Sequence, residues 1–397
     1  MQTDESSPMG DMTVPTTDAD ALAAQIDAEE PVVLLDVRMR DEFETWHIDG
    51  PAVDAINIPY IEFLQGEVPP SASEALPTDA QVTVICAKGG SSEFVAAVLA
   101  DAGYDVNHLE DGMQGWARVY DRREITAHDG PATVYQYHRR SSGCLGYLIV
   151  GGDAAAVVDP LRAFTDRYLE DAAAEGADLT VAIDTHVHAD HISALPALSA
   201  AGIDARMSPG ALDRGVTHAE IAPLEDGETI SLGDAAVEAV ATPGHTTGMM
   251  SVLIDGSTLL TGDGLFVDSV ARPDLEEGDA GAEPAARQLY ASLQERILPM
   301  DAETVIAGAH TGGQAPPAAD GTITAPLGEI VSRMPILTAD ESAFVTEVLR
   351  EMPPRPANYQ QIIDINLGAD RADDATAFRL ELGPNNCAAS TDALTSS

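Results

Sequence analysis

The stretch that decides the fold of the second half of the chain is Thr185-His-Val-His-Ala-Asp-His191, which follows the apolar run Leu179–Ile183. It places four polar groups within six residues, the side chains of His186, His188, Asp190 and His191. Four such groups this close together make a poor core, because buried imidazoles and carboxylates need polar partners. A turn that leaves the end of a strand can instead direct its side chains at one point, as a metal centre requires. The stretch therefore predicts a strand followed by a metal-binding turn.

Three later turns each follow an apolar, strand-like run and carry one more potential metal ligand. His245 lies in Thr-Pro-Gly-His-Thr, Asp263 in Leu-Thr-Gly-Asp-Gly and His310 in Ala-Gly-Ala-His-Thr. The runs before them are Val237–Ala241, Ser257–Leu260 and Thr304–Ala307. Together with the first turn they form one predicted constellation of seven ligands: His186, His188, Asp190, His191, His245, Asp263 and His310.

The length and the charge of the chain set further limits. A chain of 397 residues is too long for one ordinary core, so we expect two domains. An apolar fraction of 45% is typical of a soluble globular protein. The net charge is −46, and self-repulsion on this scale opposes compaction unless molar salt shortens the screening length to about 3 Å. Because the acids are spread through the chain, we expect a cytoplasm of very high ionic strength.

This charge argues against nucleic acids and anionic membranes as partners. Three scattered cysteines, Cys86, Cys144 and Cys387, are too few for a disulfide framework. The first residues lack the basic and apolar regions of a signal peptide, and no apolar run is long enough to span a membrane. We therefore expect a cytoplasmic protein, with a homodimer as one candidate assembly.

Apolar runs alternate with helical segments in residues 15–122. Val32–Leu35, Val82–Ile85 and Val106–Leu109 are predicted strands, and the predicted helices are Asp18–Ile26, Glu93–Ala102 and one that begins at Asp111. Strands that alternate with helices indicate a parallel α/β layer. Residues 1–14, which are polar, are expected to be loose.

The loop Cys86-Ala-Lys-Gly-Gly-Ser-Ser92 follows the strand Val82–Ile85 and leads into a helix. Gly89 and Gly90 permit backbone angles at which successive N–H groups converge on one point, beside the N-terminus of that helix. A sulfur in such a cradle is favoured as a thiolate, and Lys88, the only lysine of the chain, adds positive charge. We predict that Cys86 and Lys88 are catalytic and that Gly89, Gly90, Ser91 and Ser92 contact the substrate; the alternative is an inert buried cysteine.

Several segments of this region resemble a single rhodanese domain: Asp36-Val-Arg, Glu42–Ile48, Asn57-Ile-Pro, the Cys86 loop and Gly112-Met-Gln-Gly-Trp116. The resemblance covers about residues 15–122. It implies that Cys86 carries sulfane sulfur as a persulfide. The loop departs from the arginine-containing form of many members, since Lys88 and Ser91-Ser92 stand there, which leaves the sulfur donor open.

The second domain is predicted over residues 132–368, after a polar linker over residues 123–131 and before a C-terminal tail over residues 369–397. Its motif His-x-His-x-Asp-His with the three later turns resembles the metallo-β-lactamase superfamily over about residues 132–312. The resemblance implies an αββα sandwich with a metal at the edges of the sheets. The expected fold class is therefore α/β, with a rhodanese-like domain followed by this sandwich.

Two metal assignments are open on the sequence. Two zinc ions would be held by three histidines and by Asp190, His191 and His310, with Asp263 as the bridge, which suits hydrolysis of an ester or thioester. A single Fe(II) would instead be held by His186, His245 and Asp263, a two-histidine, one-carboxylate face that leaves positions for a thiolate, oxygen and water. In that case Asp190, which we assign a catalytic role, orients the ligands or holds protons. The remaining predicted ligands, His188, His191 and His310, do the same.

Two segments favour the single iron. Leu265-Phe-Val-Asp-Ser-Val-Ala-Arg-Pro-Asp-Leu275 resembles the segment after the carboxylate ligand in persulfide dioxygenases, and Met352–Tyr359 through Asn366 resembles the end of that family. Within the first segment, Arg272 is expected to pair with Asp274 and shape the substrate mouth; the alternative is a solvated surface arginine. The fusion with a persulfide-handling cysteine is a further argument, because it raises the local concentration of a shared intermediate.

The predicted function is therefore that of a persulfide dioxygenase, which oxidises a low-molecular-weight thiol persulfide with oxygen to sulfite and free thiol. Cys86 would exchange sulfane sulfur with thiosulfate, sulfite or the same persulfide. The alternative is a dinuclear zinc thioester hydrolase of glyoxalase II type with an accessory rhodanese domain. A third hypothesis, a non-enzymatic sulfur carrier, is disfavoured because no expected ligand is missing.

Overall fold

A computed structural model describes residues 14–218, 220–311, 315–350 and 352–389. The chain divides into two compact units, residues 1–119 and 120–397, which are described separately below. Residues 1–13, expected to be loose, lie outside the described residues. Among the described residues, none of the helices has both the length and the apolar character needed to cross a lipid bilayer.

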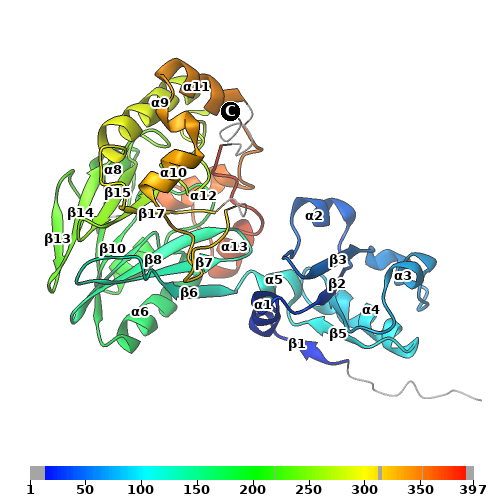
Figure 1. Cartoon of the computed structure of the whole chain (residues 1–397). Coiled ribbons are helices and arrows are strands. Elements are labelled where there is room, and N and C mark those ends of the chain that lie inside the picture. Colours follow the sequence, from blue (N-terminus) through cyan, green and yellow to red (C-terminus); the bar gives the residue numbers. More distant parts are fainter. Residues whose placement is uncertain (1–13, 219, 312–314, 351, 390–397) are drawn as a thin grey trace, which may run out of the picture. The chain divides into compact units, whose positions relative to one another are not determined.

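The first unit is built on a parallel five-stranded sheet of order β1-β5-β4-β2-β3 (Figure 1). Its strands are β1 (Thr16–Thr17), β2 (Val32–Asp36), β3 (Val53–Asn57), β4 (Val82–Ile85) and β5 (Val106–Leu109). Its helices are α1 (Ala19–Asp27), α2 (Arg40–Thr45), η1 (Tyr60–Phe63), α3 (Pro70–Ala75), α4 (Gly90–Asp101) and α5 (Gly112–Trp116). The central strand β4 is fully buried, which matches its uninterrupted apolar sequence. Its carboxyl end delivers Cys86 to the start of α4.

The second unit contains two sheets (Figure 1). A seven-stranded sheet has the order β12-β11-β10-β9-β8-β7-β6 and comprises β6 (Tyr120–Glu124), β7 (Thr133–Arg139), β8 (Cys144–Gly151), β9 (Ala154–Val158), β10 (Asp178–Ile183), β11 (Asp204–Met207) and β12 (Ile221–Pro223). A six-stranded sheet follows the order of the chain, with β13 (Thr229–Leu232), β14 (Ala235–Ala241), β15 (Met250–Ile254), β16 (Thr258–Gly262), β17 (Val305–Gly308) and β18 (Ala325–Pro326). Strands β7, β8 and β9 form an antiparallel meander.

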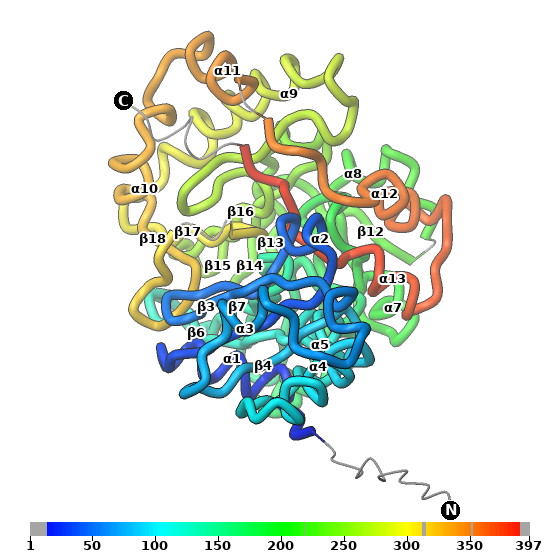
Figure 2. The backbone as a smooth tube through the Cα atoms, turned by 90° about the vertical axis from the view of Figure 1, so that its right-hand side faces the viewer, coloured from blue at the N-terminus to red at the C-terminus, as the bar shows by residue number. Residues whose placement is uncertain are grey.

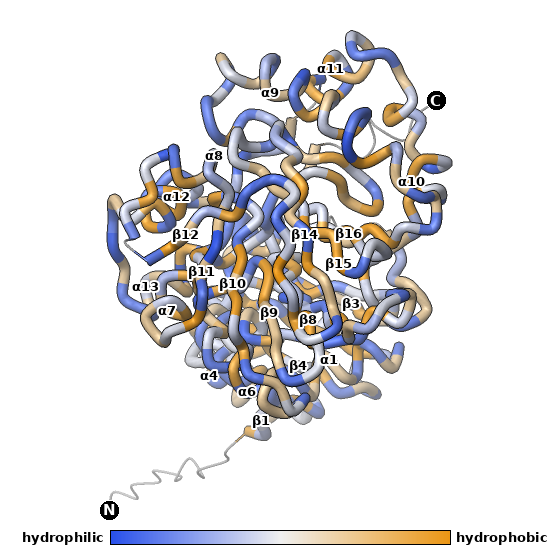
Figure 3. The backbone as a smooth tube through the Cα atoms, turned by 90° about the vertical axis from the view of Figure 1, so that its left-hand side faces the viewer, coloured by the Kyte–Doolittle hydropathy of each residue, from blue (hydrophilic) through white to orange (hydrophobic). Residues whose placement is uncertain are grey.

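The two sheets pack face to face, and helices cover their outer faces. Alternate residues of β8 such as Leu145 and Ile149 contact Val237 and Val252 of the other sheet in one apolar core. Figure 3 shows the hydrophobic colour concentrated on β8–β10 and β14–β16. One outer face is covered by α6 (Thr165–Ala174), α7 (Leu195–Ala200) and α8 (Pro209–Asp213), and the other by α9 (Gly278–Ser292), η3 (Leu293–Ile297), α10 (Leu327–Arg333), η4 (Pro335–Thr338) and α11 (Glu341–Arg350). The predicted αββα sandwich is thereby confirmed.

The expected domain limits differ from the structure at two places. The unit boundary lies at Val119 and Tyr120, because Tyr120–Glu124 pairs with β7 as an edge strand instead of beginning a polar linker. The expected tail over residues 369–397 contains the helix α13 (Asp374–Leu380), and Cys387 further along is buried. Figure 2 shows α12 (Tyr359–Leu367), α13 and α7 on the same side of the second unit.

The helix α7 begins at Leu195, several residues after the His-rich turn. Residues between the turn and this helix pair with another segment: Arg162 donates its N–H to the carbonyl of Ile192, and Ala194 donates to the carbonyl of Pro160. That other segment forms a 3-10 turn, η2 (Arg162–Phe164), and continues as α6. These pairings tie the segment after the His-rich turn to the segment after β9.

Candidate metal centre and cysteine loop

The seven predicted ligands all lie at the carboxyl ends of strands in the second unit. The turn that follows β10 carries His186, His188, Asp190 and His191, while His245, Asp263 and His310 follow β14, β16 and β17. All seven are at least 95% buried. The structure does not bring them to one point, however. Among the described residues, possible ligand atoms form four groups that differ in chemistry, and Asp263 and His310 each belong to two of them.

The first group consists of His186, His245 and Asp263. Nε2 of His186 lies 3.7 Å from Oδ2 of Asp263, and Nε2 of His245 lies 3.5 Å from the same oxygen. Within the described residues, neither Nε2 of His186 nor Oδ2 of Asp263 has a hydrogen-bond partner, although both are buried. Unpaired buried polar atoms are costly, so two nitrogens and one oxygen that converge in this way fit a metal ion well.

Hydrogen bonds from the surrounding chain orient both imidazole rings of this group. Nδ1 of His245 lies 2.8 Å from the carbonyl oxygen of Arg272, so Nδ1 carries the proton and donates it to this oxygen. The lone pair of Nε2 is therefore free to bind a metal. Nδ1 of His186 lies 2.9 Å from the hydroxyl of Thr185. Burial lowers the pKa of His245, and burial together with the neighbouring His188 lowers the pKa of His186 well below its usual value. Both rings are therefore neutral, which is the state that binds metals.

The other oxygen of Asp263 is held by His310. Nδ1 of His310 lies 2.5 Å from Oδ1 of Asp263, and its Nε2 lies 2.6 Å from Oδ2 of Asp190. A carboxylate only accepts hydrogen bonds, so in the metal-free chain this geometry favours an imidazolium that donates from both nitrogens of His310. Burial opposes that charge, but the two carboxylates outweigh it and raise the pKa of His310 well above its usual value.

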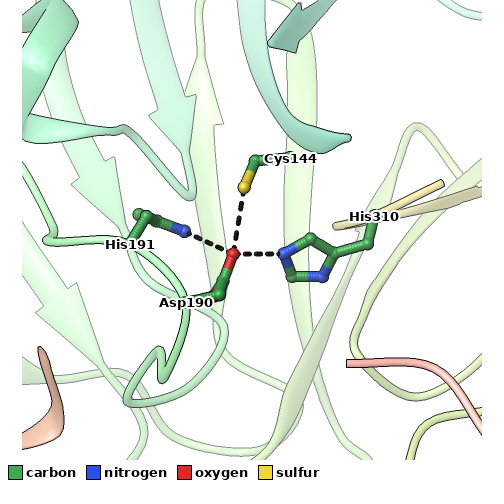
Figure 4. Close-up of side chains that lie close together, drawn as sticks. All are labelled: Cys144, Asp190, His191 and His310. Carbon is green, nitrogen blue, oxygen red and sulfur yellow. Dashed lines mark hydrogen bonds and ion pairs between the residues drawn. The ribbon is translucent and has the colours of Figure 1, made fainter. Parts of the chain in front are cut away.

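Asp190 is the centre of the second group, which also contains Cys144, His191 and His310. Figure 4 shows three donors around one oxygen of its carboxylate. Besides His310, the thiol of Cys144 lies 3.0 Å and Nδ1 of His191 lies 3.3 Å from Oδ2 of Asp190. Burial opposes ionisation of Asp190, yet His310 and His191 together bring its pKa well below the usual value. In this arrangement Oδ2 is fully occupied by proton donors.

His188 belongs to a third group, with Asp159 and Asp184. Its Nε2 lies 3.1 Å from Oδ1 of Asp159, which also accepts a hydrogen bond of 2.7 Å from the backbone N–H of Thr185. Burial opposes protonation of His188, but Asp159 raises its pKa to about 9. His188 is therefore not grouped with His186, His245 and Asp263, and an adjacent buried carboxylate holds it.

Arg272, expected at the substrate mouth, is buried, and its guanidinium forms two hydrogen bonds to Asp274, of 2.7 and 3.0 Å. Its Nη1 donates to the carbonyls of Pro354 and Asn386. The expected pairing with Asp274 is therefore present, and the alternative of a solvated surface arginine is wrong. Through its backbone carbonyl, the same residue orients His245.

Sequence reasoning did not place Cys144 or Cys387 in the site. The structure places both thiols beside the candidate centre, since the Sγ of Cys387 lies within ligand spacing of Asp263 and His310. The segment that carries Cys387 pairs with the Arg272 segment, whose backbone N–H donates to the carbonyl of Cys387. Burial raises the pKa of Cys144 to about 12 and raises that of Cys387 well above its usual value, so both are thiols. No local sequence signal indicated these contacts, because their partners are distant in the chain.

In the first unit, Cys86 lies in a loop whose polar groups turn toward its sulfur. The backbone N–H of Gly89 points to Sγ at 3.1 Å, and the thiol donates to the hydroxyl of Ser92 at 3.3 Å. The cradle requires glycine at position 89, where φ is +92°. Gly90 is instead the first residue of α4.

The remaining predicted loop residues differ in exposure. Lys88 is exposed, Ser91 is half-buried and Ser92 is fully buried, with its hydroxyl donating to the carbonyl of Gly89. Lys88 therefore presents the single lysine charge of the chain at the surface of this loop.

Comparison with protein families finds two matches along the chain. The model of the rhodanese-like domain matches residues 18–119, and that of the metallo-beta-lactamase superfamily matches residues 141–310. The two matches fall in the two structural units, and the second covers all seven predicted ligands.

Curated relatives of two kinds are similar to the chain. The mitochondrial persulfide dioxygenase ETHE1 of Homo sapiens is 31% identical over 202 residues, which cover 48% of this chain and 73% of the relative. The hydroxyacylglutathione hydrolase of Methylococcus capsulatus is 34% identical over 205 residues, which cover 51% of this chain and 75% of the relative. Both kinds of relative are enzymes.

Solved structures support the fold. The structure of ETHE1 from Myxococcus xanthus is 26% identical with a TM-score of 0.51, and the match covers 59% of this chain and 98% of that protein. A metallo-beta-lactamase from Staphylococcus aureus is 23% identical with a TM-score of 0.53, covering 60% of this chain and 73% of that protein. The second likeness concerns the fold alone.

Proposed function

The chain belongs to the metallo-β-lactamase superfamily and carries a rhodanese-like domain ahead of that fold, and from this premise we propose that it is a persulfide dioxygenase. The substrate is a low-molecular-weight thiol persulfide, and the products are sulfite and the free thiol. In the overall reaction the sulfur–sulfur bond breaks and the terminal sulfur is oxidised while oxygen is reduced. One oxygen molecule and one water supply the three oxygens of sulfite, and two protons are released.

The proposal depends on one observation above all, the double engagement of His310. With both nitrogens donating to carboxylates, His310 has no lone pair for a metal, and Oδ2 of Asp190 already accepts three hydrogen bonds. Of the two groups of possible ligand atoms among the described residues that do not include His310, the one formed by His186, His245 and Asp263 contains two imidazoles and one carboxylate. Two imidazoles and one carboxylate form the donor set typical of mononuclear non-haem iron oxygenases.

The proposed cofactor is one Fe(II) held by Nε2 of His186, Nε2 of His245 and Oδ2 of Asp263. Bound there, it would supply a redox-active ion with positions open to a thiolate and to oxygen. Arg272 and Thr185 fix the two rings through their hydrogen bonds, and His310 fixes Asp263 so that one oxygen remains free. The chain of Asp190, His310 and Asp263 holds a proton next to the donor set.

Cys86 is proposed to carry sulfane sulfur that it exchanges with thiosulfate, sulfite or the same thiol persulfide. The N–H of Gly89 and the hydroxyl of Ser92 support this role, because they place polar hydrogen-bonding groups against the sulfur. The persulfide is the intermediate that the two domains share, because one domain carries it and the other oxidises it. Fusion of the two domains in one chain raises the local concentration of this intermediate.

The proposed function is tested by oxygen uptake on the purified full chain after anaerobic loading with Fe(II). Glutathione persulfide and coenzyme A persulfide are the probes, because the identity of the thiol carrier is open. We expect oxygen consumption that matches sulfite formation one to one, and its loss in His245→Ala. Iron-loaded protein that consumes no oxygen with any persulfide would contradict the proposal.

A dinuclear zinc thioester hydrolase is the second candidate, and two atoms favour it. Nδ1 of His188 and Nε2 of His191 are both buried and, within the described residues, have no hydrogen-bond partner. Each could bind a metal ion through its lone pair when its ring is neutral. Two zinc ions per chain with thioester cleavage that is independent of oxygen and of Cys86 would establish this candidate instead.

We further propose that the protein works in a cytoplasm of very high salt, and the net charge of −46 supports this. Its unfolding midpoint should rise when KCl increases from 0.1 M to several molar. A homodimer stays a prediction, which sedimentation at the same salt concentrations would test.

A further inference from the structure

The turn that carries His186, His188, Asp190 and His191 is neither helix nor strand. Its backbone N–H and C=O groups are therefore not paired by a regular ladder, although the segment is buried. Buried backbone groups need partners from elsewhere, because an unpaired group costs about as much as a lost hydrogen bond. The question is which parts of the chain provide these partners.

Two side chains from the C-terminal region pair with four backbone groups of the segment. The amide nitrogen of Asn366 donates to the carbonyls of His188 and His191, both at 2.9 Å. Its amide oxygen accepts from the N–H of Ser193 at 3.0 Å. Glu381 accepts from the N–H of Ile192 at 2.8 Å. All three hydrogen bonds of Asn366 therefore go to the His-rich turn and the residues that follow it.

Asn366 lies near the end of α12, a helix outside the residues that match the metallo-β-lactamase superfamily. The same helix also contacts the segment through apolar side chains, because Ile362 and Ile365 pack against Ile192 in one buried cluster. Figure 2 shows α12 on the same side of the second unit as α7, the helix that begins three residues after Ile192. The polar and the apolar contacts thus fix the same backbone from one direction.

We propose that Asn366 is a positioning residue of the metal centre, whose amide holds the backbone of the ligand-bearing turn and thereby sets its affinity for the metal. It contacts neither metal nor substrate. On the opposite side Asp159 holds the start of the turn through the N–H and hydroxyl of Thr185. The inference rests on the metal centre of the proposed function, but it holds for an oxygenase and for a hydrolase alike.

The test measures Co²⁺ binding by the metal-free full chain in Asn366→Ala, Asn366→Asp and the parent. Partners that orient metal ligands typically contribute 10–100-fold to affinity, so we expect the dissociation constant of Asn366→Ala to rise by about that factor. The d–d absorption of bound Co²⁺ should shift as well, because the ligand geometry changes. Asn366→Asp retains the acceptor for Ser193 and the side-chain volume but places a carboxylate oxygen against two carbonyls, so its affinity should fall at least as far.

Gln361→Ala is the matched control, because Gln361 is an exposed amide on the same helix. Its Co²⁺ affinity and spectrum should equal those of the parent. Thermal unfolding of each metal-free variant identifies the folded fraction, and Asn366→Asp alone decides the matter if Asn366→Ala does not fold. An affinity within about twofold of the parent and an unchanged Co²⁺ spectrum in a folded Asn366 variant would overturn the proposal. A parent that binds Co²⁺ tightly but shows no dioxygenase activity with iron would remove the proposed function and leave this inference standing.

Discussion

Replacement of His310 by glutamine distinguishes a bridging imidazolium from a metal ligand. His310 makes two short hydrogen bonds to carboxylates, of 2.5 and 2.6 Å, and a glutamine amide can replace only one of them. Removal of one partner from a buried ion pair typically costs about 3–5 kcal/mol. We expect the free energy of unfolding of the metal-free protein to fall by about this amount at pH 7.

The metal stoichiometry of His310→Gln should nevertheless stay at one per chain. The variant keeps His186, His245 and Asp263 but loses the hydrogen bond that orients Asp263, which should weaken metal affinity about 10–100-fold, or about 1.4–2.8 kcal/mol. His245→Ala, which removes a donor nitrogen, should retain no metal after desalting. Chemical denaturation measures the free energy of unfolding, and competition with a chromophoric chelator measures the metal affinity.

His128→Gln is the control for the loss of a buried histidine. His128 contacts Asp255 and the hydroxyl of Thr258, at the end of β16 that is distant from Asp263. This variant should lose stability without losing metal affinity. If His310→Gln instead lowers the zinc content from two ions per chain to one, His310 is a ligand of a second metal and our reasoning is refuted.

Three further predictions concern the cysteine loop and the pH dependence. Cys86→Ser should abolish sulfur transfer from thiosulfate to cyanide but leave oxygen uptake with added thiol persulfide unchanged; parallel loss of both activities would contradict separate sites. Burial raises the pKa of Asp184 from 3.8 to about 7, so the stabilisation from its protonated form is present below pH 3.8 and is lost as the pH rises through 7. Asp184→Asn should therefore raise the unfolding midpoint at pH 8 more than at pH 5. Equal changes at the two pH values would count against this prediction. The carboxylate of Asp159 outweighs burial and raises the pKa of His188 to about 9, so the metal-free protein should lose stability between pH 6.5 and 9. In denaturation measurements, Asp159→Asn should reduce this dependence of the unfolding free energy on pH. An unchanged pH dependence would argue against the ion pair.

Local sequence patterns were sufficient for the strands and for the position of the ligands. The predicted strand Val82–Ile85 matches β4 in both limits, and the runs before His245, Asp263 and His310 are β14, β16 and β17 within a few residues. These features follow from the apolar character of buried strands and from turns at their ends, which adjacent residues encode.

The grouping of the seven residues around different partners could not be predicted in the same way. Whether the ring of His188 faces a metal or a carboxylate depends on Asp159, which lies 29 residues earlier in the chain. The state of His310 depends on Asp190 and Asp263 together, across 120 and 47 residues. Spacing identifies candidate ligands, but hydrogen bonds between distant segments decide which atoms remain free.

The order of the C-terminal region was left open by the sequence for a related reason. The helix α13 and the segment around Cys387 are ordered by long-range contacts. Asn385 donates to the carbonyl of Ser142, and Ala271 and Ala388 form an antiparallel bridge. Single hydrogen bonds of this kind leave no periodic signal in the sequence.

The most direct test of the central claim is the metal and oxygen stoichiometry of the intact chain. Protein purified without added metal, then loaded anaerobically with Fe(II) and zinc in competition, is analysed for metal content and for oxygen uptake with glutathione persulfide. Our account predicts one iron per chain and one oxygen consumed for each sulfite formed. Two zinc ions per chain, with no oxygen consumed by the iron-loaded protein, would contradict it.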